Sequence, residues 1–139
     1  MNLRLETGKM IIKIPSDIRR MREVSLKILG SLKSYDLDND RMFDIRLAVE
    51  EAVRNAIIHG NESDKAKSVT ITYWIEDDKI NVVVEDEGKG FDPLGLPDPT
   101  ANDNIMKNSG RGVYLVKKLM DEVEFNAIGN KLKMTKKLK

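Results

Sequence analysis

Hydrophobic residues follow two different spacings in the first part of the chain, and each spacing predicts a type of element. Over residues 3–14, apolar side chains alternate or cluster on both sides of a Thr-Gly-Lys turn, which predicts extended chain at the edge of a sheet. Over residues 18–32 they recur every three or four positions. This second spacing predicts a helix that has Ser16 as its N-cap and ends near Ser34.

The helical spacing returns over residues 42–56 after a polar break at residues 36–40. It predicts a second amphipathic helix that runs to about His59, with Gly60 as its C-terminal stop. From residue 68 the spacing changes to two, on both sides of an Asp-Asp-Lys turn. That change predicts a β-hairpin.

Glycine and proline concentrate in residues 88–112, which predicts a long irregular loop. Loops of this length are uncommon inside a compact domain, and most of them are either functional lids or disordered segments. Residues 113–120 then fit a short helix, and residues 125–135 fit a closing hairpin. The whole order predicts an α+β fold, a two-layer sandwich in which three helices cover one face of a mainly antiparallel sheet.

Composition narrows the class of protein. The 139 residues are 40% hydrophobic, which predicts a single domain over residues 1–139. The formal net charge is +1, so the sequence gives no electrostatic indication of direct nucleic-acid binding. The chain has no cysteine and one histidine, which excludes disulfides, thiolate sites and multi-histidine metal sites. It has no apolar stretch long enough for a membrane span, and we expect a soluble cytoplasmic protein.

Candidate chemistry begins on the second helix, where Glu51, Asn55 and His59 are spaced by four and share one stripe. A carboxylate and an amide supply oxygen ligands that suit Mg²⁺ and its waters. The same spacing also fits an ordinary solvated helix face, and His59 fits a packed or capping residue better than a catalyst.

Two further elements contain glycines beside polar residues. Asp86 continues the alternation of the second hairpin strand, so an acid stands where a core residue is expected, and Gly88 and Gly90 follow it. A buried carboxylate needs donors, which an amino group on a planar base would supply. Ser109-Gly110-Arg111-Gly112 lies directly before the third helix, where exposed N–H groups favour phosphate. Read singly, the first pattern also fits a turn-rich or calcium loop, and the second a capping turn.

The order and spacing of these elements resemble the Bergerat-type ATP-binding fold of the GHKL superfamily, which is the histidine-kinase-like ATPase fold. More closely, residues 50–60 (EEAVRNAIIHG), 86–93 (DEGKGFDP) and 109–112 (SGRG) look like those of single-domain anti-sigma factors that are also serine-protein kinases. The resemblance covers nearly the whole chain.

The resemblance implies a role for each matching residue. Glu51 would be the general base, and Asn55 would coordinate the Mg²⁺ that bridges the phosphates of ATP. Asp86 would receive the adenine amino group, while Gly88 and Gly90 let the chain pass the base. An ATP lid over about residues 91–110 would close so that three residues wrap the phosphates: Gly110, Arg111 and Gly112.

The resemblance also implies partners. The kinase would phosphorylate a serine on an anti-anti-sigma protein and would otherwise hold a sigma factor, with Arg22 of the first helix in those contacts. Such proteins commonly form homodimers. The alternative is an ATP-binding switch module that sequesters a partner without kinase activity.

Two positions depart from the pattern of these relatives. Asn108 stands where some relatives have an arginine aimed at the terminal phosphate, and Lys107 or Arg111 would replace it here. Asn130 stands where relatives usually have a threonine, which is expected near the phosphate end of the site. These departures bear on phosphoryl transfer more than on ATP binding.

Overall fold

The computed structural model of this protein describes residues 2–88 and 108–139, and the expected ATP lid lies mostly outside these ranges. The strands are β1 (Asn2–Glu6), β2 (Lys9–Pro15), β3 (Ser68–Glu76), β4 (Lys79–Glu85), β5 (Glu122–Phe125) and β6 (Lys131–Lys137). The α-helices are α1 (Met21–Gly30), α2 (Asn39–Asn55) and α3 (Asn108–Leu119). Shorter helical turns are η1 (Ile18–Arg20), η2 (Lys33–Tyr35) and the π-helical η3 (Ala56–Gly60).

The strands form a six-stranded sheet in the order β1-β2-β3-β4-β6-β5, and each neighbouring pair is antiparallel. Two of the hairpins turn at Thr7-Gly8 and at Asp77-Asp78, where both central residues of each turn have positive φ. Turns of this kind match the right-handed twist of the strands that they join, so they favour tight hairpins. The predicted antiparallel sheet is therefore confirmed.

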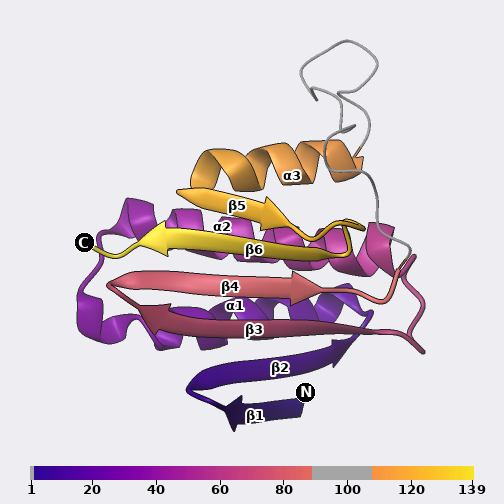
Figure 1. Cartoon of the computed structure of the whole chain (residues 1–139), viewed down its shortest axis with the longest axis horizontal. Helices are drawn as coiled ribbons and strands as arrows, with labels where there is room; N and C mark the ends of the chain where they lie inside the picture. Colours follow the sequence, from indigo (N-terminus) through magenta and orange to yellow (C-terminus); the bar gives the residue numbers. More distant parts are fainter. Residues whose placement is uncertain (1, 89–107) are drawn as a thin grey trace.

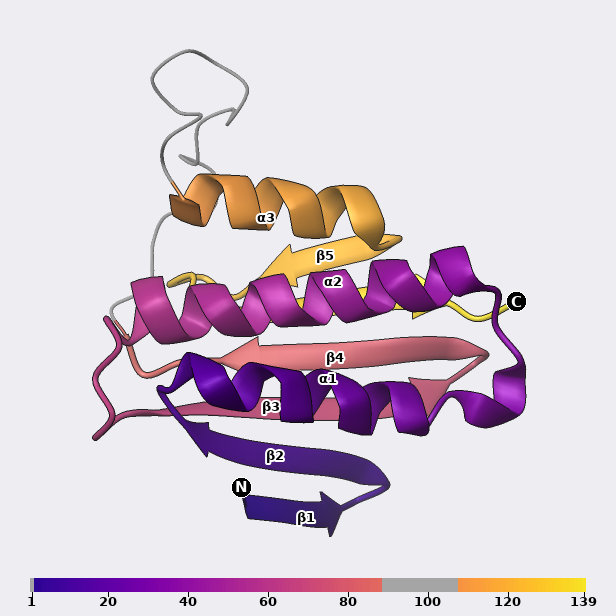
Figure 2. The same cartoon turned by 180° about the vertical axis from the view of Figure 1, so that it is seen from behind.

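The helices lie on one face of the sheet, which gives the expected two layers (Figures 1 and 2). Figure 2 shows α1 and α2 side by side over the central strands, while β1 and β2 extend beyond α1. Every residue of β1 is exposed, and Leu5 is 70% exposed. None of the described helices is long and apolar enough to cross a membrane.

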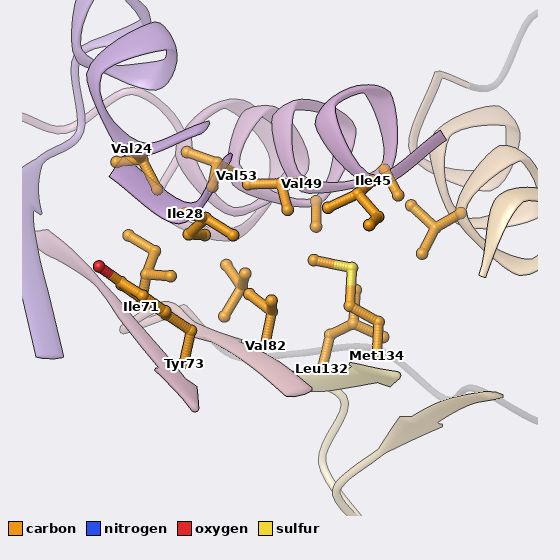
Figure 3. Packing of buried hydrophobic residues seen from close by; sticks show 14 of the residues in the cluster. Val24, Ile28, Ile45, Val49, Val53, Ile71, Tyr73, Val82, Leu132 and Met134 are labelled. Carbon is orange, nitrogen blue, oxygen red and sulfur yellow. The ribbon is translucent and has the colours of Figure 1, made fainter. Parts of the chain in front are cut away.

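The core lies between α1, α2 and the inner face of the sheet (Figure 3). Side chains with zero exposure come from all three: Val24, Ile28, Ile45, Val49, Val53, Ile71, Val82 and Met134. Burying each large aliphatic side chain stabilises a fold by about 1.5–3 kcal/mol, so this interface fixes α2 on the sheet. The C-terminal end of α2 is thereby held beside the start of β3 and the end of β4.

The first helix differs from its prediction at both ends. Asp17, and not Ser16, caps the first turn, because its Oδ1 accepts a hydrogen bond from the Arg19 N–H at 3.0 Å. Ser16 is 2% exposed, and its Oγ donates to the Lys67 carbonyl oxygen at 2.8 Å. A buried hydroxyl that serves the tertiary structure in this way is not available as a cap. The regular helix ends at Gly30, before the predicted Ser34.

Candidate functional site

The end of α2 places two of the predicted residues one helical turn apart. Glu51 and Asn55 are both partly buried on this helix. A Cβ atom added to Gly112 would lie 2.3 Å from the Asn55 Nδ2 atom, so the first part of α3 packs directly on the Asn55 amide. We call this contact between Asn55 and Gly112 the Asn55 end of the site.

The glycine motif does not lie before the third helix, as the sequence predicted, because α3 already begins at Asn108. Gly110 and Gly112 therefore belong to the first turns of the helix. The first four N–H groups of an α-helix have no partner within the helix, and they carry the positive end of its dipole. The start of the helix itself therefore provides what was expected of this motif, which is a set of N–H donors that suit an anion.

Two adjacent carboxylates on α2 have different surroundings. The Oε2 atom of Glu50 accepts hydrogen bonds from the Ser25 hydroxyl at 2.6 Å and the Arg46 Nε at 3.2 Å, which ties α1 to α2. Among the described residues, none forms a hydrogen bond or ion pair with the Glu51 carboxylate. Glu50 is therefore occupied by the fold, while the Glu51 carboxylate is open to a reactant.

The other end of the site is built around Asp86, which follows β4. Its Oδ1 accepts a hydrogen bond from the Gly88 N–H at 2.8 Å. A Cβ atom at Gly60 would lie 2.2 Å from the Asp86 Oδ2 atom, and one at Gly88 would lie 2.0 Å from the Gly60 carbonyl oxygen. The three residues Gly60, Asp86 and Gly88 thus pack closely, and we call them the Asp86 end.

Burial raises the pKa of the Asp86 carboxyl, and the neighbouring Glu85 carboxylate raises it further. The Gly88 N–H and the Lys67 ammonium oppose this shift because they stabilise the ionised form. A partly desolvated carboxylate with an open oxygen is a strong acceptor for a ligand N–H group.

Gly60 was predicted to stop the helix, and its position as the last residue of η3 agrees with that. Its φ is not positive, however, so a left-handed cap is not the reason for a glycine here. The π-helical turn carries Gly60 against the Asp86 carboxylate, where only a hydrogen atom fits. Gly88 is likewise required by its contact with Gly60, a reason for glycine in addition to the expected approach of the backbone to a base.

Asn130 lies at the Asp86 end, which differs from its expected place near phosphates. Its carbonyl oxygen accepts from the Asp86 N–H at 3.0 Å, and its Nδ2 lies 3.5 Å from the Gly88 carbonyl oxygen. The Asn126 side chain holds the turn by accepting from the Gly129 N–H at 2.8 Å and donating to the Asn130 Oδ1 at 2.7 Å. The β5–β6 turn therefore holds the backbone of Asp86, while Gly60 packs against its carboxylate.

Arg22 is exposed on α1, apart from these residues. Arg19 and Arg20 are engaged in ion pairs, with Asp17 at 2.6 Å and with Glu23 at 3.2 Å. The described part of the chain gives the Arg22 guanidinium no such pair, which leaves it open to a partner. Gly90 and Lys107 lie outside the described residues, as does the side chain of Arg111.

His59 is exposed, which excludes the packed one of the two roles expected for it, a packed or a capping residue. Partial desolvation and the nearby Arg54 charge both lower its pKa. Gly60 and Asn61 are the residues of the site that sequence reasoning missed. The only signal was their position directly after the helix that contains Glu51 and Asn55.

Comparisons with known proteins identify the family to which this fold belongs. The family of histidine kinase-like ATPase domains matches residues 14–136. Serine-protein kinase RsbW from Bacillus subtilis is 32% identical over 91% of this chain and 84% of its own length. Its namesake from Staphylococcus aureus is 29% identical over 92% of this chain and 86% of its own length.

A solved structure shows the same fold. The crystal structure of the RsbU and RsbW domains of a Mycobacterium tuberculosis protein superimposes with a TM-score of 0.61 at 20% sequence identity. The match covers 95% of this chain and 32% of that chain, so the present fold corresponds to about a third of the larger protein. With the match over residues 14–136, the chain belongs to the family of histidine kinase-like ATPase domains.

Proposed function

We propose that the protein binds ATP with Mg²⁺ and phosphorylates a serine of an anti-anti-sigma protein. The observation that carries this proposal is that residues 51–60 reach both ends of the site: Asn55 contacts Gly112, and Gly60 contacts Asp86. The kinase relatives at 29–32% identity support the reaction class. We further propose that residues 1–139 act as one ATP-binding unit.

The Asp86 end fits an adenine. One oxygen of the carboxylate is held by the Gly88 N–H, and the other remains to accept from the amino group of the base. Close packing of Gly60 and Gly88 keeps this carboxylate partly desolvated, which strengthens a hydrogen bond to it. We propose that Gly90, beyond the described residues, lets the chain follow the base.

The Asn55 end fits phosphates and a hard cation. The Asn55 amide oxygen is a ligand of the type that Mg²⁺ prefers, and the start of α3 supplies N–H donors and dipole charge. Gly110 and Gly112 would bring these donors to the phosphates, and the cations Lys107 and Arg111 would add charge. Asn55 would hold the Mg²⁺, and this cation would supply positive charge that stabilises the negative charge on the phosphates.

We propose Glu51 as the general base. Its carboxylate would accept the proton of the substrate serine hydroxyl while the serine oxygen bonds to the γ-phosphorus of ATP. The bond between that phosphorus and the bridging oxygen breaks, and ADP leaves with the electron pair. Phosphoryl transfer needs mainly positioning and charge neutralisation, so few catalytic side chains suffice.

Two measurements test this function. Calorimetric titration with Mg-ATP should show binding of one nucleotide per chain. Incubation with Mg-ATP and each anti-anti-sigma protein of the source organism should produce phosphoserine, detected by mass spectrometry. ATP binding without phosphorylation of any of these proteins favours the alternative function, a switch module that sequesters a partner. The asparagine at position 108, where some relatives have an arginine, supports this alternative. No binding would contradict both functions.

We propose that the same protein holds a sigma factor, with Arg22 in the contact. Arg22 lies on the exposed part of α1, four residues after Ile18 of η1 and four before Leu26 of α1, and these two apolar side chains are 51% and 53% exposed. A cation that has no ion pair among the described residues and lies near two exposed apolar side chains suits a partner that offers a carboxylate beside an apolar patch. We therefore also propose a cytoplasmic location, where a sigma factor would act.

We also propose a homodimer, formed through the outer face of the sheet. A hollow of about 470 Å³ lies on this face around Trp74, whose ring carries Lys9 Nζ at 4.0 Å and Lys133 Nζ at 5.6 Å. One edge strand, β5, is acidic through Glu122 and Glu124. The opposite edge carries basic side chains, Arg4, Lys9 and Lys13, beside a single acid, Glu6. A two-fold axis parallel to the strands places each edge against its opposite in the second copy.

Replacing Trp74 by Glu should convert the dimer to a monomer, because it removes the central aromatic ring and adds a charge on the axis. Light scattering at micromolar concentrations measures the mass of wild type and variant. Leu5→Glu, on the other face of the sheet, is the control and should leave the dimer intact. A wild-type protein that is monomeric across this range would contradict the proposal.

Replacing Gly112 by Ala should weaken ATP binding by about tenfold, because a methyl group 2.3 Å from the Asn55 Nδ2 atom forces the amide to move. The fold should tolerate the change, since the Asn side chain can rotate and Ala favours the helix. Gly30→Ala is the matched control, because a Cβ atom at this helical glycine has nothing within 4 Å. Calorimetry with Mg-ATP on the three proteins gives the comparison, and equal affinities would contradict the proposed Asn55 role.

A further inference from the structure

The side chain of Asn61 is fully buried and bonded to three separate segments. Its Nδ2 donates to the Ser16 hydroxyl at 2.9 Å and to the Ser68 carbonyl oxygen at 3.0 Å. Its Oδ1 accepts from the Glu87 N–H at 2.8 Å. An asparagine side chain offers two N–H donors and one acceptor oxygen, so each of its groups is engaged.

Asn61 is connected to the surroundings of Asp86 in two ways, through the chain to Gly60 and through a hydrogen bond to Glu87. Asn61 directly follows Gly60, whose Cα lies against the Asp86 carboxylate. Its Oδ1 holds the N–H of Glu87, the residue directly after Asp86. The Glu87 carboxylate in turn accepts from the Ser68 N–H, so the same short stretch is fixed to the start of β3. Asn61 therefore sets the separation between the end of η3 and the chain at residues 86–88.

We infer that Asn61 is a positioning residue that holds the Asp86 carboxylate in place for the base of the nucleotide. The inference rests on the proposed ATP function. Without the Oδ1 acceptor, the Glu87 N–H loses its partner, and the turn at residues 86–88 keeps only its bonds to Ser68 and Asn130. The Gly88 N–H that orients the Asp86 Oδ1 atom belongs to this turn, so the carboxylate is less firmly held when the turn loosens.

The preference of the protein for ATP over ITP is the measurement that distinguishes a positioning role of Asn61 from a general contribution to stability. ITP carries an oxygen where ATP carries the adenine amino group, so this position of the base accepts a hydrogen bond and cannot donate one to Asp86. In wild type, ATP should bind more tightly than ITP. Asn61→Ala should weaken ATP binding by about tenfold, the size of effect that supporting partners have on the groups they orient, and should bring the ATP/ITP ratio close to one.

Ser16→Ala is the matched control. It removes a buried hydrogen-bond partner of the same Asn61 side chain, yet it leaves the bond from Glu87 intact. Both variants should unfold at lower temperature than wild type, as followed by circular dichroism. Only Asn61→Ala should lose base discrimination, measured by calorimetry at a temperature where each protein is folded.

Asn61→Asp provides a second variant should Asn61→Ala fail to fold. It keeps an oxygen that accepts from the Glu87 N–H, so its ATP/ITP ratio should stay near that of wild type although its stability falls. Wild-type discrimination in Asn61→Ala, or lost discrimination in Asn61→Asp, would overturn the inference. A wild-type protein that binds neither nucleotide would instead contradict the proposed function, so the two failures are distinguishable.

Discussion

Replacing Asp86 by Asn should weaken ATP binding by about a hundredfold, the loss expected for a buried charge-assisted hydrogen bond. The Gly88 N–H donates to Oδ1, which fixes the carbonyl oxygen of the new amide at that place. Its NH₂ group must then occupy the Oδ2 position and face the amino group of the base. Two donors pointed at each other cannot bond. Calorimetric titration with Mg-ATP measures the change, and affinity within threefold of wild type would contradict the role of Asp86.

The same variant should be more stable than wild type when no nucleotide is present. The raised pKa of Asp86 means that the folded protein holds this proton more tightly than the unfolded chain. Ionisation of Asp86 therefore costs stability above the folded pKa, and the cost vanishes below the ordinary aspartate value of 3.8. Asp86→Asn should raise Tm by a few degrees at pH 7, and the difference should shrink as the pH falls towards 3.8. A variant less stable than wild type at pH 7 would contradict this account.

Replacing Glu51 by Ala should reduce phosphoryl transfer by roughly 10²–10⁴-fold and leave ATP affinity within about twofold of wild type. A general base acts on the serine hydroxyl during transfer, and it does not contact the nucleotide. The Glu51 carboxylate forms no hydrogen bond or ion pair with the described residues, so its removal should leave Tm nearly unchanged. Phosphoserine formation over time, with saturating Mg-ATP and the partner protein, gives the rate.

The neighbouring carboxylate provides the control for this experiment. Glu50→Gln keeps a side chain that accepts a hydrogen bond from the Ser25 hydroxyl but removes the charge beside Arg46. It should transfer phosphate at nearly the wild-type rate. Equal losses in the two variants would show that the effect comes from charge on α2 and not from a base at position 51. Transfer that survives in Glu51→Ala would assign the base to another residue.

Periodicity and turn chemistry were enough to predict most of the fold. The period of two over β3 and β4 and the turn at Asp77-Asp78 predicted their hairpin, because one face of each strand packs on the helices. The spacing over α2 predicted a helix whose buried stripe includes Ile45, Val49 and Val53. These are local patterns that a single buried face imposes on the chain.

The sequence did not reveal features that depend on contacts between distant segments. Glycine disfavours a helix, so the sequence predicted that α3 begins after Gly110 and Gly112, although it begins earlier, at Asn108. Gly112 is needed because Asn55 packs against it, and Gly60 because Asp86 does. Ser16 and Asn61 bond to each other across 45 positions of the chain, which no local pattern indicates.

The candidate residues were nevertheless predicted by type and order. Glu51 and Asn55 stood out through helical spacing, and Asp86 through an acid at a core position. Position 130 was placed at the wrong part of the site, because the β5–β6 turn folds back onto the Asp86 N–H. The structure adds that Glu50 is engaged with Ser25, which explains why Glu51 and not its neighbour is the available acid.

That bond has a consequence for how such a protein can diversify. The proposed partner contact on α1 and the nucleotide contacts on α2 and β4 come from separate elements, and Ser25 with Glu50 supplies a polar contact between the two helices. Substitutions on the outer side of α1 around Arg22 leave this contact and the buried stripe untouched. After gene duplication, two copies can acquire different partner preferences on α1 while both keep the same nucleotide contacts. One ancestral protein can in this way give rise to two regulators that respond to different partners.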